Sequence, residues 1–256
     1  MSRYALGTIV ESVPEPWSES QIYTGLLDYY DHWQTIDPRM AEHHECLSGA
    51  AQVLGNDIVN LATYAHEILN WLDPARIREG RSVVTVGGMA EAFLVSVRSA
   101  CDAVAQAISY KASSKPGQVP KDMRGLLSWA QQNQARVEPA FLSLLSGDMN
   151  WFWNLRSLRD HIVHGGADAN IQTDGRQFNL WVHSPTAGWV TREPLLPLLS
   201  KKYQRLISFS DEASKLINAA INLPSDRLRS RVVSGVLVPS LHRLVRIAGD
   251  YSDPSP

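Results

Sequence analysis

Three long stretches of the sequence carry apolar residues at helical spacing. The first runs from Pro38 to about Leu72, and it begins with Asp37 and Pro38, a capping residue followed by the residue favoured at the first helical position. The others run from about Met89 to Ala112 and from Leu195 to about Asn222. Apolar residues cover most of the circumference of the second stretch, which indicates a buried helix. The sequence therefore predicts a mainly α fold.

Shorter helices are predicted over much of the rest of the chain, with a few non-helical segments between them. Residues 1–16 lack a helical period and are expected to form an extended arm, and a short helical turn is expected at Ala75–Arg78. Val83–Gly88 is β-branched and glycine-punctuated, so we expect a connector or short strand there. Pro239 is expected to kink or split the last helix. The further predicted helices are Ser18–Ile36, Asp122–Val137, Pro139–Leu145, Met149–His164 and Ser225–Ala248.

Beyond Gly166 the apolar period changes from helical spacing to alternation, which is typical of β-strands. The dipeptide Asp174-Gly175 is suited to a tight hairpin turn, and Gly188–Thr191 is expected to add a third strand. The sequence thus predicts a small antiparallel β-hairpin or three-stranded meander inserted over 167–192. Trp181 and Trp189 are expected to be cross-strand packing partners. The alternating residues are Ile171, Thr173, Arg176, Phe178, Leu180 and Val182.

The charge balance is close to neutral, with 24 Lys plus Arg against 26 Asp plus Glu. This excludes a protein that coats nucleic acid nonspecifically, so any nucleic-acid contact must be local. Cys46 and Cys101 lie in apolar periodic stretches without paired spacing, which favours buried free thiols and a reducing compartment. No uncharged apolar run reaches about 18 residues, and the N-terminus lacks the apolar stretch of a signal peptide. We therefore expect a cytoplasmic protein without membrane contact.

A single helical domain is expected over 1–256, because a chain of this length can bury a sufficient core without disulfides or metal. Within it, residues 1–36 form the N-terminal arm and first helix. Residues 37–222 form the core, with the β insert at 167–192, and residues 223–256 form the C-terminal helix and tail.

The helix predicted over Met149–His164 carries most of the chemistry. Asp148 is placed to cap its start, and Gly165-Gly166 is a C-terminal stop signal. The helix C-terminus and the carboxylate of Asp160 favour a protonated His164, which could act as acid and base near neutral pH. Arg159 can bind phosphate bidentately. The apolar stripe comprises Trp151, Leu155, Leu158 and Ile162, and the polar side comprises Arg156, Arg159, Asp160, His161 and His164, with Phe152 and Trp153 projecting toward it as an interface or base-stacking surface.

The run Arg159-Asp160-His161-Ile162-Val163-His164-Gly165 resembles the R-x4-6-H motif of the HEPN superfamily. The resemblance extends to the order of elements between about Met89 and Asn222: a long buried helix, the motif helix, a short insert and a closing helix. It implies a compact helical bundle. Many members are metal-independent endoribonucleases of toxin–antitoxin, phage-defence or RNA-processing systems. Active members usually dimerise, with two motif helices facing each other across one cleft.

The resemblance also implies residue roles. Arg159 and His164 would be catalytic, Asp160 would orient them, and Arg156 and His161 are expected to bind substrate. A histidine would take the proton of the RNA 2′-hydroxyl or donate one to the leaving 5′-oxygen, while Arg159 neutralises phosphoryl charge. No metal or other cofactor is required, and the product would be a 2′,3′-cyclic phosphate. Expected partners are RNA, a second copy of the chain and an antitoxin or other protein. RNA affinity would come from Arg227, Arg229, Arg231, Arg243 and Arg246.

Other readings of the same residues stay open. The pairs Arg39–His44, Arg156–His161 and Arg176–His183 share the motif spacing, but only Arg159–His164 combines a following aspartate, a capped helix and a glycine stop. The polar side could be a solvated ion-pair lattice in which His164 caps the helix. The chain could also be a non-catalytic dimeric adaptor or regulatory binding protein. The remaining alternatives are a metal site of His161 and His164 with His43, His44 or Glu45, and a buried-edge charge network of Glu91, Arg98 and Asp102.

Overall fold

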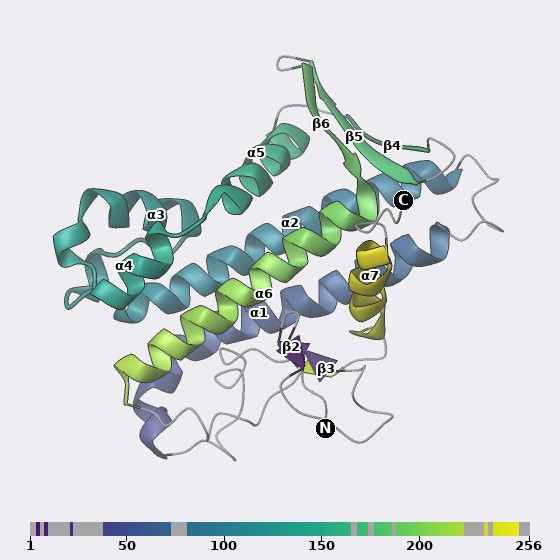
Figure 1. Cartoon of the computed structure of the whole chain (residues 1–256). Helices are drawn as coiled ribbons and strands as arrows, with labels where there is room; N and C mark the ends of the chain where they lie inside the picture. Colours follow the sequence, from purple (N-terminus) through teal and green to yellow (C-terminus); the bar gives the residue numbers. More distant parts are fainter. Residues whose placement is uncertain are drawn as a thin grey trace. The chain divides into compact units, whose positions relative to one another are not determined.

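Helices make up most of the computed structural model, which describes residues 4–5, 8–9, 21–22, 38–72, 81–164, 168–173, 177–185, 188–222, 233–234 and 238–250. Three of them are long: α1 (Pro38–Trp71), α2 (Arg81–Lys111) and α6 (Leu195–Ala220) (Figure 1). The shorter ones are α3 (Met123–Gln132), α4 (Pro139–Ser146), α5 (Asn150–His164) and α7 (Val238–Asp250). The predicted mainly α fold with a small antiparallel meander is confirmed.

The chain divides into two compact units, and α1, α2 and α6 each contribute one part to both. Unit 1 comprises 1–58, 99–149 and 205–234, and it contains α3, α4 and four two-residue strands. Unit 2 comprises 59–98, 150–204 and 235–256, and it contains α5, α7 and a three-stranded sheet. The expectation of one domain over 1–256 stays a prediction, since three helices are continuous across the division.

In unit 1, two carboxylates fix the start of α3. Asp122 is its N-cap and accepts a hydrogen bond from the Gly125 amide at 2.8 Å, while Asp102 of α2 accepts one from the Met123 amide at 2.8 Å. Both satisfy amides that the helix itself leaves without partners. The helix ends at Gln132, earlier than predicted, because the backbone and side-chain amides of Asn133 both donate to the Trp129 carbonyl at 2.9 Å.

The sheet of unit 2 is a meander of β4 (Asp168–Thr173), β5 (Phe178–Ser184) and β6 (Gly188–Pro194) in the order β4-β5-β6. Its second hairpin closes with Ser184 opposite Gly188, whose φ of 70° lies in the left-handed region that favours glycine. Leu180 and Val182 of β5 are fully buried, and α5 contacts both β5 and β6 (Figure 1). The sheet therefore lies beside the helix that carries the candidate motif.

Val83–Gly88 belongs to α2, so the predicted connector or short strand is wrong. Val86, Ala90 and Phe93 follow one another at steps of four and three residues and are at most 1% exposed. Burial of this helical face outweighs the modest helix propensity of the β-branched residues.

The two ends of the chain differ from the predicted helices. Gln21–Ile22, inside the predicted helix Ser18–Ile36, forms strand β3 between β1 (Tyr4–Ala5) and β7 (Val233–Ser234), so strand pairing there overrides the local helical period. The predicted helix Ser225–Ala248 begins only at Val238, as α7. Pro239 lies in its first turn, where a missing N–H needs no partner, so it does not kink a longer helix. The rest of 18–36 and the turn at 75–78 lie outside the described residues.

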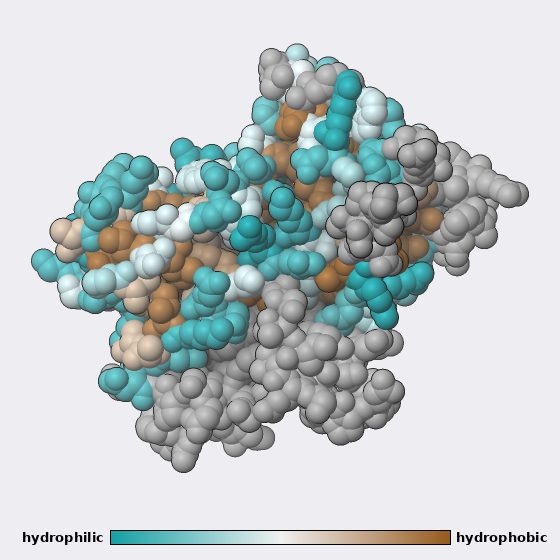
Figure 2. Space-filling model, in the orientation of Figure 1, coloured by the Kyte–Doolittle hydropathy of each residue, from teal (hydrophilic) through white to brown (hydrophobic). Residues whose placement is uncertain are grey.

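Within the described part of the chain, α2 alone has the length and composition of a membrane span, with a mean hydropathy of 1.3 and 44% of that window buried. Core helices have the same properties, and the cytoplasmic location stays a prediction. Figure 2 shows hydrophilic side chains over much of the described surface, with apolar ones between them. Cys101 is buried as predicted, but Cys46 is exposed, so the prediction of two buried thiols is wrong for Cys46.

Candidate functional site

The start of α5 is anchored in the core of unit 2. Trp151, Phe152, Leu155 and Leu158 are buried, and the predicted stripe is thus confirmed for three of its four members, Ile162 being half-buried. Phe152 was expected on the polar side and is instead fully buried, with the Arg98 guanidinium 4.9 Å from its ring centroid. The helix packs through a wider apolar face than the predicted stripe because its first turn is enclosed.

Lys202 of α6 gives the start of α5 a polar attachment. This lysine is 7% exposed, and its Nζ donates a hydrogen bond to the Trp151 carbonyl at 3.2 Å. Together with the Arg98–Phe152 contact, it ties α5 to both α6 and α2. Neither contact was foreseen, because a lysine or arginine within an amphipathic helix is ordinarily expected to reach solvent.

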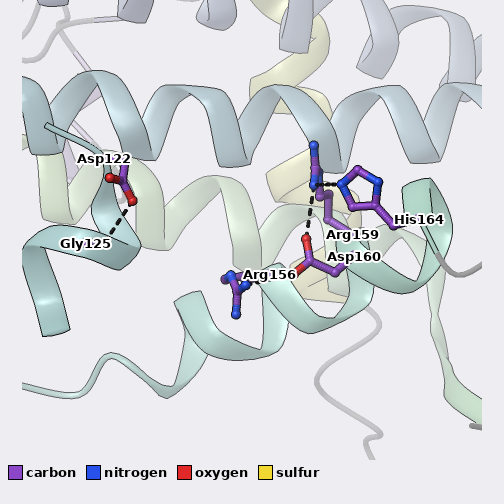
Figure 3. A network of polar contacts seen from close by, with 6 residues as sticks. All are labelled: Asp122, Gly125, Arg156, Arg159, Asp160 and His164. Carbon is purple, nitrogen blue, oxygen red and sulfur yellow. Dashed lines mark hydrogen bonds and ion pairs between the residues drawn. The ribbon is translucent and has the colours of Figure 1, made fainter.

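The second half of α5 presents a chain of polar contacts (Figure 3). An Arg156 Nη2 atom lies 3.2 Å from Asp160 Oδ2, and Arg159 Nη1 lies 3.1 Å from Asp160 Oδ1. The same Nη1 atom lies 2.8 Å from His164 Nε2. The structure thus brings together four of the five predicted site residues. The carboxylate contacts the two arginines, whereas the imidazole contacts Arg159.

The Arg159–His164 contact determines which form of the imidazole fits this geometry. A guanidinium can only donate hydrogen bonds, so His164 Nε2 must accept, and its proton must reside on Nδ1. A hydrogen bond between these two atoms is one that only a neutral imidazole can make. A neutral imidazole with an available nitrogen lone pair is the form required of a general base.

The site is open enough to be reached by a large substrate. His164 is exposed, while Arg156 and Arg159 each have 28% of the side chain exposed and Asp160 has 34%. Deeper in the site, Arg159 Nε is buried and has no hydrogen-bond partner among the residues that the structure describes. The Nε end of the Arg159 guanidinium is therefore enclosed, whereas part of the side chain is exposed to solvent.

Several predicted residues are not part of this cluster. His161 is half-buried and makes no side-chain hydrogen bond within the described part of the chain. Arg243 and Arg246 are exposed on α7, but Arg227, Arg229 and Arg231 lie outside the described residues. Asp102 of the expected charge network accepts a hydrogen bond from the Met123 amide at the start of α3, and the network itself stays a prediction.

The predicted metal site has no set of ligands among the residues that the structure describes. Among the described residues, no group of three or more His, Cys, Asp or Glu side chains is placed to hold a metal ion. His43 Nδ1 lies 2.8 Å from the Tyr110 hydroxyl, and the side chains of His44 and Glu45 are outside the description.

Comparisons of the chain with protein-family models, with curated proteins and with solved structures give no match. The residues of α5 and their geometry are therefore the features of the chain that bear on its function.

Proposed function

We propose that this chain is an HEPN-like, metal-independent endoribonuclease in which Arg159 and His164 act on the RNA phosphodiester. The observation that carries the proposal is the 2.8 Å contact between Arg159 Nη1 and the Nε2 atom of an exposed His164. A cation and a neutral base on one helix end are the two groups that cleavage through the 2′-hydroxyl requires. Their partial exposure leaves room for a polynucleotide.

The reaction can be written with the chain's own groups. The 2′-oxygen attacks phosphorus while its proton passes to His164 Nε2, and the bond from phosphorus to the 5′-oxygen breaks. The leaving 5′-oxygen takes a proton from water or from the imidazole of a second copy in a dimer. The products are a 2′,3′-cyclic phosphate and a free 5′-hydroxyl. Arg159 stabilises the charge that grows on the phosphoryl oxygens, and Asp160 orients its guanidinium.

Substrate binding falls to the remaining polar groups of α5. Arg156 lies beside Asp160, and its guanidinium carbon is 6.0 Å from the centroid of the Trp153 ring. An arginine held over an aromatic ring keeps its donors available for phosphate while the ring limits its motion. His161 is retained as a weaker candidate for substrate contact. A defence, toxin–antitoxin or stress role, with an antitoxin or other protein partner, follows from the same proposal.

The test is cleavage of a labelled single-stranded RNA by the purified chain in the presence of a chelator. We expect His164→Ala to lower the rate by roughly 10²–10⁴-fold and Arg159→Ala by roughly 10²–10³-fold, because each removes one chemical contribution. Replacing the 2′-hydroxyl at the cleaved position by hydrogen should abolish cleavage there. Mass spectrometry should find the 2′,3′-cyclic phosphate.

Two variants outside the site control for general damage. Lys121→Ala removes an exposed lysine just before α3, and Lys215→Ala removes a lysine whose side chain is 69% exposed. Both should cleave like the unmodified chain, and all variants should unfold at the same urea concentration. Retention of full cleavage by a folded His164→Ala variant would refute the nuclease mechanism.

The alternative function is a non-catalytic dimeric adaptor or regulatory binding protein. It is favoured by two exposed apolar side chains on α5, Trp153 at 37% and Val163 at 46%, which are suited to a protein interface. This alternative predicts no cleavage by the unmodified chain and a dimer mass that Arg159→Ala and His164→Ala leave unchanged. Cleavage that depends on His164 excludes it.

A further inference from the structure

One face of the three-stranded sheet in unit 2 points away from the buried side chains of Leu180 and Val182. Because side chains alternate along a strand and paired residues share a face, Trp181 between these two, its alternate neighbours on β5 and the residues paired with them lie on the outer face. We define the sheet face as Asn170, Gln172, Asn179, Trp181, His183 and Arg192. Four of these residues are exposed, and Asn179 and Trp181 are half-buried.

The centre of the sheet face is a tryptophan paired with an arginine. Trp181 is paired with Asn170 on one side and with Arg192 on the other, and the Arg192 guanidinium carbon lies 4.5 Å from the Trp181 ring centroid. Trp189 stands opposite His183 beyond a register shift, and its side chain lies outside the described residues, so the packing of Trp181 against Trp189 stays a prediction. A cation therefore lies over this ring.

The chemistry of the sheet face fits the bases and backbone of a single strand of RNA. Aromatic rings and guanidinium planes are the surfaces on which unpaired bases stack, and amide side chains can hydrogen-bond base edges. Both kinds of group are present here, in Trp181 with Arg192 and in Asn170 with Gln172 and Asn179.

The one permanently charged side chain that the structure describes on the sheet face has the sign that a phosphate backbone needs. Of the side chains on it that the structure describes, Arg192 alone carries a permanent charge. Glu193 follows on β6 but pairs in register with the buried-side residue Leu180, and its carboxylate accepts a hydrogen bond from Thr191. Asp168 pairs with His183 in the backbone, and its side chain lies outside the described residues.

The position of the sheet face suits a role beside the proposed catalytic groups. Strand β4 begins four residues after His164, and α5 contacts β5 and β6. Chain geometry limits the separation of the His164 and Trp181 backbones to at most about 26 Å. A bound strand of a few nucleotides can span such a distance, since single-strand sites commonly cover about 4–16 nucleotides.

We propose that the sheet face is a binding site for single-stranded RNA, in which a base stacks on the Trp181–Arg192 pair. The proposal rests on the proposed function for the identity of the nucleic acid, but it assigns a separate set of residues from those that would cut the chain. It also predicts that recognition depends on unpaired bases, because a duplex does not expose base faces for stacking.

The test is direct binding of a fluorescently labelled single-stranded RNA of about 12 nucleotides, with 2′-hydrogens in place of the 2′-hydroxyls so that it cannot be cleaved, measured in the His164→Ala background. Adding Trp181→Ala should weaken binding by about tenfold or more, and Trp181→Phe should retain most of the affinity, because a stacking ring remains. Arg192→Ala should weaken binding and reduce the logarithmic salt slope by about 0.7, the value for one lost single-strand contact. A fully paired RNA should bind with an affinity that Trp181→Ala leaves unchanged.

The chain offers a matched control elsewhere. Trp129 of unit 1 also has an arginine near its ring, with the Arg136 guanidinium carbon 5.9 Å from the centroid, but it lies on α3 and not on the sheet. Trp129→Ala should leave single-strand binding unchanged, and circular dichroism should show native helix content in every variant.

The outcomes separate this proposal from the nuclease proposal. Equal single-strand affinity for folded Trp181→Ala and Arg192→Ala chains and their parent overturns the binding site, even if His164 is needed for cleavage. No binding of single-stranded RNA by the parent chain overturns it as well. Loss of binding in these variants, together with full cleavage by His164→Ala, upholds the binding site while the nuclease proposal fails.

Discussion

Substitution of Asp57, in the middle of α1, tests whether the packing of unit 1 buries this carboxyl group. The residue is 8% exposed, and its Oδ2 atom is buried without a hydrogen-bond partner in the described part of the chain. Burial raises the pKa of Asp57 from 3.8 to about 6, and a hydrogen bond from the Ser99 side chain acts in the opposite direction. We expect Asp57→Asn to remove this titration and to make the free energy of unfolding less dependent on pH than in the unmodified chain.

The sign follows from which state holds the proton. Between about pH 4 and about pH 6 the folded chain keeps a proton on Asp57 that the unfolded chain has released, so this residue's contribution to stability falls as pH rises through that window. A pKa shift from 3.8 to about 6 corresponds to about 3 kcal/mol, at about 1.4 kcal/mol per unit. The free energy of unfolding of Asp57→Asn minus that of the unmodified chain should therefore rise by up to about 3 kcal/mol between about pH 4 and about pH 7.

The assay is urea unfolding of both chains at several pH values between about 4 and about 7.5. The diagnostic quantity is the change with pH of the stability difference, because the buried amide of asparagine adds a constant cost of its own. Ser99→Ala is the matched variant: without the hydrogen bond that lowers the pKa of Asp57, the window should extend to higher pH. A stability difference between Asp57→Asn and the unmodified chain that stays constant over the whole range would refute this reasoning.

Two further substitutions test local packing. Gly125→Ala should cost about 1–2 kcal/mol in urea unfolding, because a Cβ atom there would lie 2.7 Å from Asp122 Oδ2 and 2.8 Å from Pro120 Cβ and would displace the N-cap of α3. In an Asp122→Ala background the added cost should shrink, and an undiminished cost would contradict the capping explanation. Phe152→Ala should cost about 3–5 kcal/mol, because the ring is fully buried under Arg98. A loss below about 1 kcal/mol would show that the ring is not enclosed.

The sequence predicts the helices well where apolar periodicity and capping agree. Pro38 begins α1 as expected, Pro139 begins α4, and Asp122 caps α3. These signals are local, because a cap or a proline acts on amides within one turn of itself. The predictions were wrong where distant partners decide the structure. Burial of a helical face makes Val83–Gly88 part of α2, and pairing with neighbouring strands makes Gln21–Ile22 a strand.

The candidate site was predictable in its membership but not in its contacts. Helical spacing places Asp160 and His164 as neighbours four residues apart, yet the imidazole contacts Arg159, five residues before it. Residues five apart lie about 140° from each other around a helix, so this contact depends on the reach of the arginine side chain at the last turn. Likewise, the Trp181–Arg192 pair depends on a register shift in β6 that the alternation of residues does not reveal.

The two arginines that flank Asp160 have complementary consequences for the proposed chemistry. Arg159 Nη1 contacts both the carboxylate and the imidazole, so an incoming phosphate would compete with Asp160 and His164 for the same donor group. If Arg159 turns to the phosphate, Asp160 still has Arg156 at 3.2 Å, and the carboxylate is not left without a cation. The same movement frees His164 Nε2 to accept the proton of the 2′-hydroxyl. In the proposed mechanism, binding of the phosphate and release of the base are coupled when the phosphate takes the Nη1 donor that holds the imidazole.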